Sequence, residues 1–296
     1  MKSVVSYPER GPYGNNKYRG NCTGYIIKDL IEHFRPSLFV DVCEGSGTSR
    51  DVAKEMGIRY VGLDLHRGFD FTKDSVLHAV GEPSPMVFSH PPYFNMIPYA
   101  AERRKHGLLV RDQENDLSQA ISQEDFLEQA RIMLLNQREA TLTGGIYTTL
   151  IGDMRKDGRF YSFQSDFIKM MPKDELHSVV IKMQHNMNSA KSSYRGVIEI
   201  WHEYLLIWKK KQVTLAQISW DKAKEFQNGM HATWRSFIRI ALLNLGGSAT
   251  LDRIYDEVAR IADDKVKANL HYREKIRQTL QMHFTHVKRG VWSIAA

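Results

Sequence analysis

A chain of 296 residues with 42% hydrophobic side chains has room for one medium-sized domain and a small second one. No apolar run approaches the roughly 20 residues that a membrane-spanning helix needs, and the first residues lack the apolar core of a signal peptide. We therefore expect a cytoplasmic protein without a membrane partner. Its two cysteines exclude a disulfide framework, and the formal net charge of +7 suits a polyanionic partner.

The amino-terminal part of the chain indicates an arm followed by a helix. Residues 1–20 are polar and rich in proline and glycine, which is typical of a surface arm. Apolar side chains then recur at helical spacing over residues 25–34, and Pro36 follows the expected end of this helix.

A strand, a glycine turn, a helix and a second strand follow in that order. The apolar strand at residues 38–40 leads through Gly45-Ser46-Gly47 into a helical pattern, and the strand at residues 60–63 ends at Asp64. A glycine turn at a helix N-terminus presents backbone N–H groups to a ligand. An acid at the end of the second strand commonly accepts hydrogen bonds from both hydroxyls of a ribose.

The next strand, residues 86–88, runs into Ser89-His90-Pro91-Pro92-Tyr93-Phe94. Two consecutive prolines cannot donate hydrogen bonds to a strand ladder, so the strand has to stop there. The carboxyl ends of strands are where open α/β sheets place their ligand sites. The aromatic side chain after the prolines offers a flat face on which a planar group can stack.

Taken together, these motifs resemble those of the S-adenosylmethionine-dependent DNA amino-methyltransferases, which form N6-methyladenine or N4-methylcytosine. Residues 41–49, Asp-x-x-x-Gly-Ser-Gly-Thr-Ser, resemble the methionine-binding motif of that family, and residues 90–93 resemble its catalytic (Asp/Asn/Ser)-Pro-Pro-(Tyr/Phe) motif. The resemblance covers residues 13–210. The chain departs from the family pattern at His90, which replaces Asp, Asn or Ser, and at Cys43, which replaces the usual Phe.

The resemblance implies S-adenosyl-L-methionine as the cofactor and assigns a set of residues to it, with Asp74 as an alternative to Asp70. The implied cofactor-binding residues are Thr23, Asp41, Cys43, Glu44, Gly45, Ser46, Gly47, Thr48, Asp64 and Asp70. The implied catalytic residues are Ser89, His90, Pro91, Pro92 and Tyr93. No second histidine lies at metal-ligand spacing from His202, so we expect no zinc site there.

The family's activity implies that an adenine is flipped out of duplex DNA, because its exocyclic amine is otherwise held within the base stack. His90 or Ser89, together with a backbone carbonyl of the Pro-Pro turn, would accept hydrogen bonds from both amine protons, and Tyr93 would stack on the base. No endonuclease-like catalytic cluster is apparent, so we expect a methylase without cleavage activity. The carboxyl-terminal part of the chain resembles the winged-helix modules attached to restriction-modification proteins. Methylation of cytosine N4 is one alternative, and a non-catalytic DNA-binding regulator is another. Protein glutamine and RNA methyltransferases also use a Pro-Pro-Tyr turn.

The rest of the first domain alternates polar segments with expected strands. A polar segment at residues 100–122 precedes an amphipathic helix at 123–139 and a strand at 146–151; later strands are expected at 179–183 and 201–208. A second polar segment spans residues 184–196. The cations of the two segments are expected to contact DNA phosphates, with solvated loops as the alternative. The predicted DNA-binding residues among these cations are Arg103, Arg104, Lys105 and Arg195.

The sequence predicts a methyltransferase domain at residues 1–211, a connector at 212–228 and a winged-helix module at 229–296. The expected fold class is α/β, a Rossmann-like sheet with helices on both faces, joined to a module of three helices and a hairpin. Residues 231–296 hold eleven Lys or Arg against six Asp or Glu, which favours duplex DNA as the partner. The alternative is a dimerisation or lid module, so a homodimer stays open. The expected DNA-binding residues of the module are Arg273, Lys275, Arg277, Lys288 and Arg289.

Overall fold

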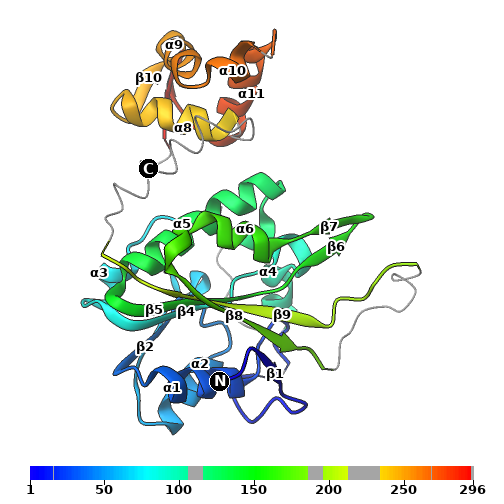
Figure 1. Cartoon of the computed structure of the whole chain (residues 1–296). Coiled ribbons are helices and arrows are strands. Elements are labelled where there is room, and N and C mark those ends of the chain that lie inside the picture. Colours follow the sequence, from blue (N-terminus) through cyan, green and yellow to red (C-terminus); the bar gives the residue numbers. More distant parts are fainter. Residues whose placement is uncertain (16, 106–115, 186–195, 213–233, 268, 295–296) are drawn as a thin grey trace. The chain divides into compact units, whose positions relative to one another are not determined.

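The computed structural model describes residues 1–15, 17–105, 116–185, 196–212, 234–267 and 269–294 (Figure 1). The chain forms two compact units, Met1–Val213 and Thr214–Ala296. Apart from Gln212, the connector expected at residues 212–228 lies outside the described residues. Among the helices of the described ranges, none combines the length and the apolar character needed to cross a membrane.

A seven-stranded sheet forms the centre of the larger unit. Each strand runs parallel to its neighbours except β9, which is antiparallel to both β8 and β5. The predicted Rossmann-like α/β sheet is thereby confirmed. In spatial order the strands are β1 (Val4–Ser6), β8 (Leu176–Met183), β9 (His202–Lys209), β5 (Thr141–Ile151), β4 (Ser84–Ser89), β2 (Leu38–Asp41) and β3 (Arg59–Gly62).

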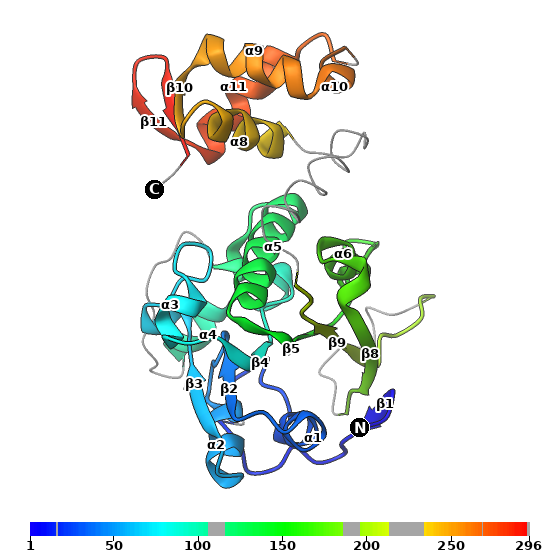
Figure 2. The ribbon, with the colours of Figure 1, turned by 60° about the vertical axis from the view of Figure 1, so that its left-hand side comes forward.

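Helices cover both faces of this sheet (Figures 1 and 2). One face carries α1 (Gly24–Phe34) and α2 (Thr48–Glu55), and the other carries α5 (Gln123–Glu139) and α6 (Phe163–Met170). Each face has its own apolar core, so the central parallel strands are buried on both sides and read as continuous apolar runs. The described residues of this unit also form α3 (Val76–Val80), α4 (Tyr99–Lys105), β6 (Met154–Lys156), β7 (Arg159–Tyr161) and the short 3-10 turns Leu65–Arg67, Phe94–Met96, Leu117–Gln119 and Lys173–Glu175.

The amino-terminal segment is more ordered than the expected surface arm. Its β1 pairs in parallel with β8 at the edge of the sheet, and Tyr13 and Tyr18 are buried. The backbone N–H of Gly14 donates to Asp51 Oδ2 at 2.8 Å, and that of Asn15 donates to Ser46 Oγ at 3.1 Å. The segment therefore lies against the glycine turn and the first residues of α2. The buried side chains of this segment, Val5, Tyr13 and Tyr18, are too widely spaced in the sequence to show a helical or strand period.

Within residues 234–267 and 269–294, the smaller unit has the three expected helices and the hairpin, with two additions. Beyond them it holds the short helix α10 (Asp263–Lys267) and the strand β10 (Ser248–Thr250), which pairs with the hairpin in a three-stranded antiparallel sheet of order β10-β12-β11. Three residues are too few for a strand period to be visible in the sequence. The other elements are α8 (Trp234–Asn244), α9 (Leu251–Ile261), α11 (Tyr272–His283), β11 (Thr285–Lys288) and β12 (Val291–Ser293).

Candidate active site

The turn between β2 and α2 is shaped by its glycines and held by Asp41. Gly45 and Gly47 have φ of +54° and +89°, a region that favours glycine. Asp41 accepts hydrogen bonds from the backbone N–H of Cys43 at 2.9 Å and from the Ser49 hydroxyl at 2.6 Å. Burial raises the pKa of Asp41 to about 7, although these two hydrogen bonds act in the opposite direction. Asp41 therefore acts as a brace for the turn.

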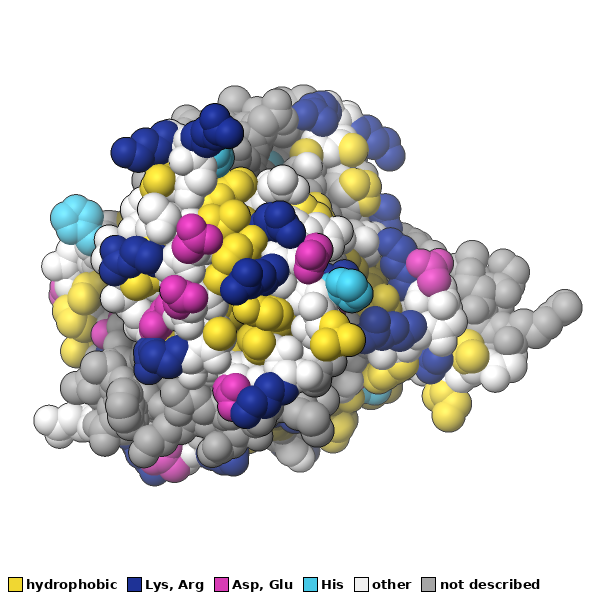
Figure 3. Space-filling model, turned by 90° about the horizontal axis from the view of Figure 1, so that it is seen from above, with side chains coloured by type: hydrophobic (Ala, Val, Ile, Leu, Met, Phe, Trp, Pro, Cys, Tyr) yellow, Lys and Arg dark blue, Asp and Glu magenta, His cyan; other side chains and the backbone are white. Residues whose placement is uncertain are grey.

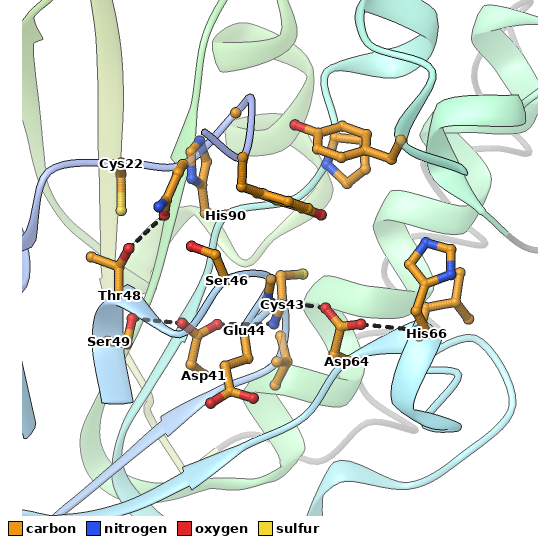
Figure 4. Close-up of a pocket in the computed structure, with 18 of the residues that line it drawn as sticks. Cys22, Asp41, Cys43, Glu44, Ser46, Thr48, Ser49, Asp64, His66 and His90 are labelled. Atoms are coloured by element: carbon orange, nitrogen blue, oxygen red, sulfur yellow. Dashed lines mark hydrogen bonds between the residues drawn. The ribbon is translucent and has the colours of Figure 1, made fainter. Parts of the chain in front are cut away.

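Asp64 follows β3 and connects the second strand to the same turn. One carboxylate oxygen accepts from the backbone N–H of Gly45 at 3.0 Å, and the other accepts from the backbone N–H of His66 at 2.9 Å (Figure 4). The residue is buried, with 8% of its surface exposed. A buried acid at the carboxyl end of a parallel strand is thus fixed beside the N-terminus of α2, the position where such sheets bind nucleotide riboses.

A cleft opens at the carboxyl ends of these strands, which is where open α/β sheets bind their ligands. It joins the glycine turn to the turn that follows β4, so two motifs that lie some forty residues apart face one space. The predicted site residues that line the cleft are Asp41, Cys43, Glu44, Gly45, Ser46, Thr48, Asp64, His90 and Pro92.

Three of the predicted cofactor-binding residues do not line this cleft. Asp70 accepts hydrogen bonds from the backbone N–H and the hydroxyl of Thr72, at 2.9 Å and 2.6 Å. Thr23 caps helix α1, and its hydroxyl donates to the Arg10 carbonyl at 3.0 Å. Gly47 is the N-cap of α2, where a Cβ would lie 2.2 Å from the Arg50 guanidinium. These residues shape the backbone around the cleft.

Ser89 points away from the cleft into the protein. Its hydroxyl donates to Gln137 Oε1 at 3.0 Å and lies 2.8 Å from the Thr149 hydroxyl. Gln137 in turn donates to the carbonyls of Val87 and Thr148. Because successive side chains of a strand point to opposite faces, only His90 of this pair can face the cleft. Pro91 is buried, and neither Pro91 nor Tyr93 lines the cleft.

A buried chain of polar groups stands behind His90. His90 Nε2 lies 2.9 Å from the Tyr93 hydroxyl, which donates to Glu203 Oε1 at 2.7 Å, and Lys182 Nζ donates to Glu203 Oε2 at 2.5 Å. Burial alone raises the pKa of Glu203, but the charge of Lys182 and the hydrogen bonds from Lys182 and Tyr93 outweigh it and lower the pKa to about 2. Glu203 is therefore ionised and only accepts hydrogen bonds.

The hydrogen bonds from Lys182 and Tyr93 to Glu203 determine which ring nitrogen of His90 carries the proton. The single hydroxyl proton of Tyr93 is used toward Glu203, so His90 Nε2 has to donate to the Tyr93 oxygen. In the neutral ring Nδ1 is then a hydrogen-bond acceptor. Burial lowers the pKa of His90 to about 4, which keeps the ring neutral at physiological pH. A neutral acceptor thus occupies the first position of the His-Pro-Pro-Tyr turn.

Several cleft residues escaped the sequence motifs. Tyr18 and Tyr99 line the cleft with ring centroids 6.0 Å apart, and a Cβ on Gly20 would lie 2.0 Å from the Tyr99 hydroxyl. Asn21 accepts from the Thr48 hydroxyl at 2.5 Å. These residues come from the amino-terminal segment and from α4, where the sequence shows no regular period. His66, Phe71, Asp116 and Leu117 also line the cleft.

The predicted phosphate contacts fall into two groups. In the larger unit Arg104 and Lys105 are exposed at the end of α4, a helix where a polar loop was expected. Arg103 lies in the same helix, and Arg195 lies outside the described residues.

In the smaller unit the predicted cations are all exposed. Arg273, Lys275 and Arg277 lie on α11, and Lys288 and Arg289 lie at the β11–β12 turn. Arg277 pairs with Glu274 at 3.4 Å, and Arg273 lies over the ring of Tyr255 at 5.3 Å. The face shown in Figure 3 carries Lys and Arg side chains interspersed with acidic and apolar ones.

No protein-family model and no curated protein matches the chain. Among solved structures it is similar to a Thermus thermophilus protein assigned as a DNA modification methylase (15% identity, 64% of this chain, 62% of that chain, TM-score 0.27). It is also similar to TehB from Haemophilus influenzae (11%, 63% and 62%, 0.33) and to an rRNA methylase from Streptococcus thermophilus (13%, 64% and 96%, 0.32). The chain spans less than two thirds of the first two. With TM-scores below 0.5, activity has to be inferred from the chain's own residues.

Proposed function

We propose that this chain transfers a methyl group from S-adenosyl-L-methionine to N6 of an adenine flipped out of duplex DNA. The observation that carries the proposal is the meeting of two motifs in one cleft. The glycine turn with Asp64 and the His90 turn both line it, and they come from neighbouring parallel strands. A donor site and an acceptor site for a transferred group would thus be adjacent.

The residues of the cleft fit the cofactor. Gly45 and Ser46 would bind its methionine part at the N-terminus of α2, and Asp64 would accept from its ribose hydroxyls. The apolar lining by Leu65, Phe71 and Leu117 suits its adenine ring. When bound, the cofactor supplies an activated methyl group on a sulfonium. The chain's own task is then to bind and orient the amine that receives it.

An amine is the acceptor that this turn suits best. The lone pair of an exocyclic amine is delocalised into the ring, so holding both amine protons in hydrogen bonds frees the lone pair for attack. His90 Nδ1 would accept one proton, and a backbone carbonyl of the turn would accept the other. Because Lys182, Glu203 and Tyr93 fix the imidazole, its acceptor is oriented before the substrate binds.

Duplex DNA is the proposed substrate because of charge and of the smaller unit. The chain carries a net charge of +7, and the order helix, strand, helices, two strands in residues 234–293 resembles that of a winged helix, which supports this proposal. In that reading α11 enters the major groove and the β11–β12 turn is the wing. The domain division proposed is residues 1–211, a connector at 212–228 and a winged-helix module at 229–296, in a cytoplasmic methylase.

The proposal can be tested by mapping modified bases in DNA from cells that express the chain. We expect N6-methyladenine at one defined sequence, absent from cells expressing the Asp64→Ala variant. Modification at cytosine N4 would replace the adenine assignment. Unmodified DNA, from cells whose purified protein binds S-adenosyl-L-methionine, would favour the non-catalytic regulator.

A further inference from the structure

A two-stranded ribbon, formed by β6 and β7, projects from the larger unit (Figure 1). In it β6 pairs with β7 in an antiparallel register that places Arg155 opposite Phe160 and Lys156 opposite Arg159. Asp157 and Gly158 connect the strands with φ of +50° and +75°. Two successive residues with positive φ form the tight connection that matches the twist of a hairpin, so the ribbon has a defined shape.

Contacts fix the ribbon to the His90 turn. It begins at Met154, three residues after β5 ends at Ile151, and β5 is the parallel neighbour of β4. Lys156 Nζ donates to Asn95 Oδ1 at 2.9 Å, and the ring of Phe94 lies 6.3 Å from that of Tyr161. The ribbon is thus held next to the residues that follow Tyr93.

The ribbon combines positive charge with an exposed aromatic ring. Arg155, Lys156 and Arg159 are accompanied by a single acid, Asp157, within residues 154–161. Phe160 is 45% exposed, and the Arg155 guanidinium lies 5.2 Å from its ring centroid. Cations placed beside an aromatic face are what a nucleic-acid contact needs, because the cations neutralise phosphates and the ring stacks on bases.

We infer that the β6–β7 hairpin holds the DNA backbone beside the flipped base, and that Phe160 stacks on the base pair next to the gap. This inference rests on the proposed function, since it takes duplex DNA as the occupant. The positive charge of the ribbon complements the DNA phosphates. Lys156 and Tyr161 of the ribbon contact residues that directly follow the His90 turn, which would receive the flipped adenine. The hairpin would thus be a DNA contact in the larger unit, in addition to the contacts proposed for the winged-helix module in the smaller unit.

The phosphate contacts can be tested through the salt dependence of binding. The full-length Lys156→Gln, Arg159→Gln variant is compared with wild type on a fluorescein-labelled duplex of mixed sequence by anisotropy at several salt concentrations. Two lost phosphate contacts should make the slope of log Kd against log salt concentration shallower by about 1.8. A Lys2→Gln, Lys54→Gln variant removes the same charge from exposed positions outside the hairpin and should change the slope by much less.

The stacking contact can be tested with a duplex that contains one abasic site, which mimics the gap left by a flipped base. Wild type should prefer this duplex over the intact one. Phe160→Ala should lose that preference, by about tenfold in Kd, while Phe160→Tyr keeps the ring and should retain it. Neither substitution removes a charge, so the salt slope should not change.

An unchanged salt slope in the double glutamine variant together with an unchanged preference in Phe160→Ala would overturn the inference, as would failure of wild type to bind duplex DNA. Methyl transfer is scored separately with S-adenosyl-L-methionine. Methylated DNA with unaltered binding by the hairpin variants would refute the hairpin alone. Altered binding without methyl transfer by wild type would refute the proposed activity and leave the hairpin as a DNA contact.

Discussion

The hydroxyl of Tyr93 donates a hydrogen bond to Glu203 Oε1 at 2.7 Å, although the two residues are 110 positions apart in the chain. Tyr93 belongs to the turn after β4, and Glu203 lies in β9, the antiparallel strand beyond β5. Gly152 makes the approach possible, since a Cβ there would lie 2.7 Å from the Tyr93 ring. This contact links the proposed catalytic turn to the buried Lys182–Glu203 ion pair.

Removing the charge of Glu203 should destabilise the fold. Glu203→Gln leaves the buried Lys182 ammonium without its counter-charge, and breaking such a pair from one side costs about 3–5 kcal/mol. The free energy of unfolding, measured with urea, checks this. The matched control is Glu82→Gln, which breaks the exposed Arg59–Glu82 pair and should cost less than about 1 kcal/mol. Similar decreases in the free energy of unfolding in both variants would show that the buried Lys182–Glu203 pair stabilises the fold no more than an exposed pair does.

The Tyr93 hydroxyl should matter for turnover and not for cofactor binding. Tyr93→Phe keeps the ring but removes the hydrogen bonds to His90 and Glu203, so the His90 tautomer is no longer fixed. We expect kcat to fall by tenfold or more while the calorimetric Kd for S-adenosyl-L-methionine stays unchanged. Tyr93→Ala should lower kcat further. A Tyr93→Phe variant with wild-type kcat would rule out orientation of His90 through this hydroxyl.

The pH dependence of stability should reveal His90. Its pKa falls from the ordinary value of 6.5 to about 4 on folding, so between these values the unfolded chain binds a proton that the folded chain does not. Stability from this group is therefore present above pH 6.5 and lost as pH falls toward 4. His90→Gln should make the plot of unfolding free energy against pH less positive in slope in that window. An unchanged slope would contradict the shift.

Asp41 gives the opposite sign in nearly the same window and serves as the control. Its pKa is raised from 3.8 to about 7, so the folded chain binds the extra proton and stability falls as pH rises through this range. Asp41→Asn should make the slope more positive.

The low pKa of His90 also predicts the pH dependence of methyl transfer. The His90 ring should stay neutral and able to accept a hydrogen bond down to about pH 4, whereas an unperturbed histidine would lose this ability below about pH 6.5.

Asp64→Ala should weaken binding of S-adenosyl-L-methionine by tenfold or more. The substitution removes the proposed ribose acceptors and also the partner of the Gly45 N–H, which helps to hold the glycine turn. Calorimetry on the purified variant measures the loss. Asp70→Ala is a useful comparison, because the Asp70 carboxylate binds Thr72 and lies outside the cleft, so affinity should change little. If wild type, Asp64→Ala and Asp70→Ala bind S-adenosyl-L-methionine with equal affinity, Asp64 does not bind the cofactor.

The sequence predicts the larger fold well where elements are long or buried. Continuous apolar runs identify β2 and β4, because parallel strands covered on both faces contain few polar residues. The two prolines after His90 correctly mark the end of β4. The short strand β1 and the buried Tyr18 have no period to reveal them, since three residues in a polar segment carry too little pattern.

The site is predictable only in part, for physical reasons. Motif spacing brings Asp64 and His90 to one cleft, but alternation along β4 turns Ser89 away, and the sequence motif treats both residues alike. The Tyr93–Glu203 contact depends on strand order across the sheet, which local patterns do not encode. The hairpin does carry a local signal, Asp157-Gly158 between short strands, which is a strong sequence indication of a tight turn.

The most direct test of the proposed activity is methyl transfer by the purified chain from S-adenosyl-L-methionine bearing a deuterated methyl group. Unmethylated bacterial DNA is the substrate, and the nucleosides are analysed by mass spectrometry after digestion. We expect deuterated N6-methyladenine with wild type, a marked loss with Tyr93→Phe, and none with a His90→Ala, Tyr93→Ala variant that still binds the cofactor. The absence of a deuterated methyl group from every DNA nucleoside, with cofactor binding by wild type intact, would contradict it.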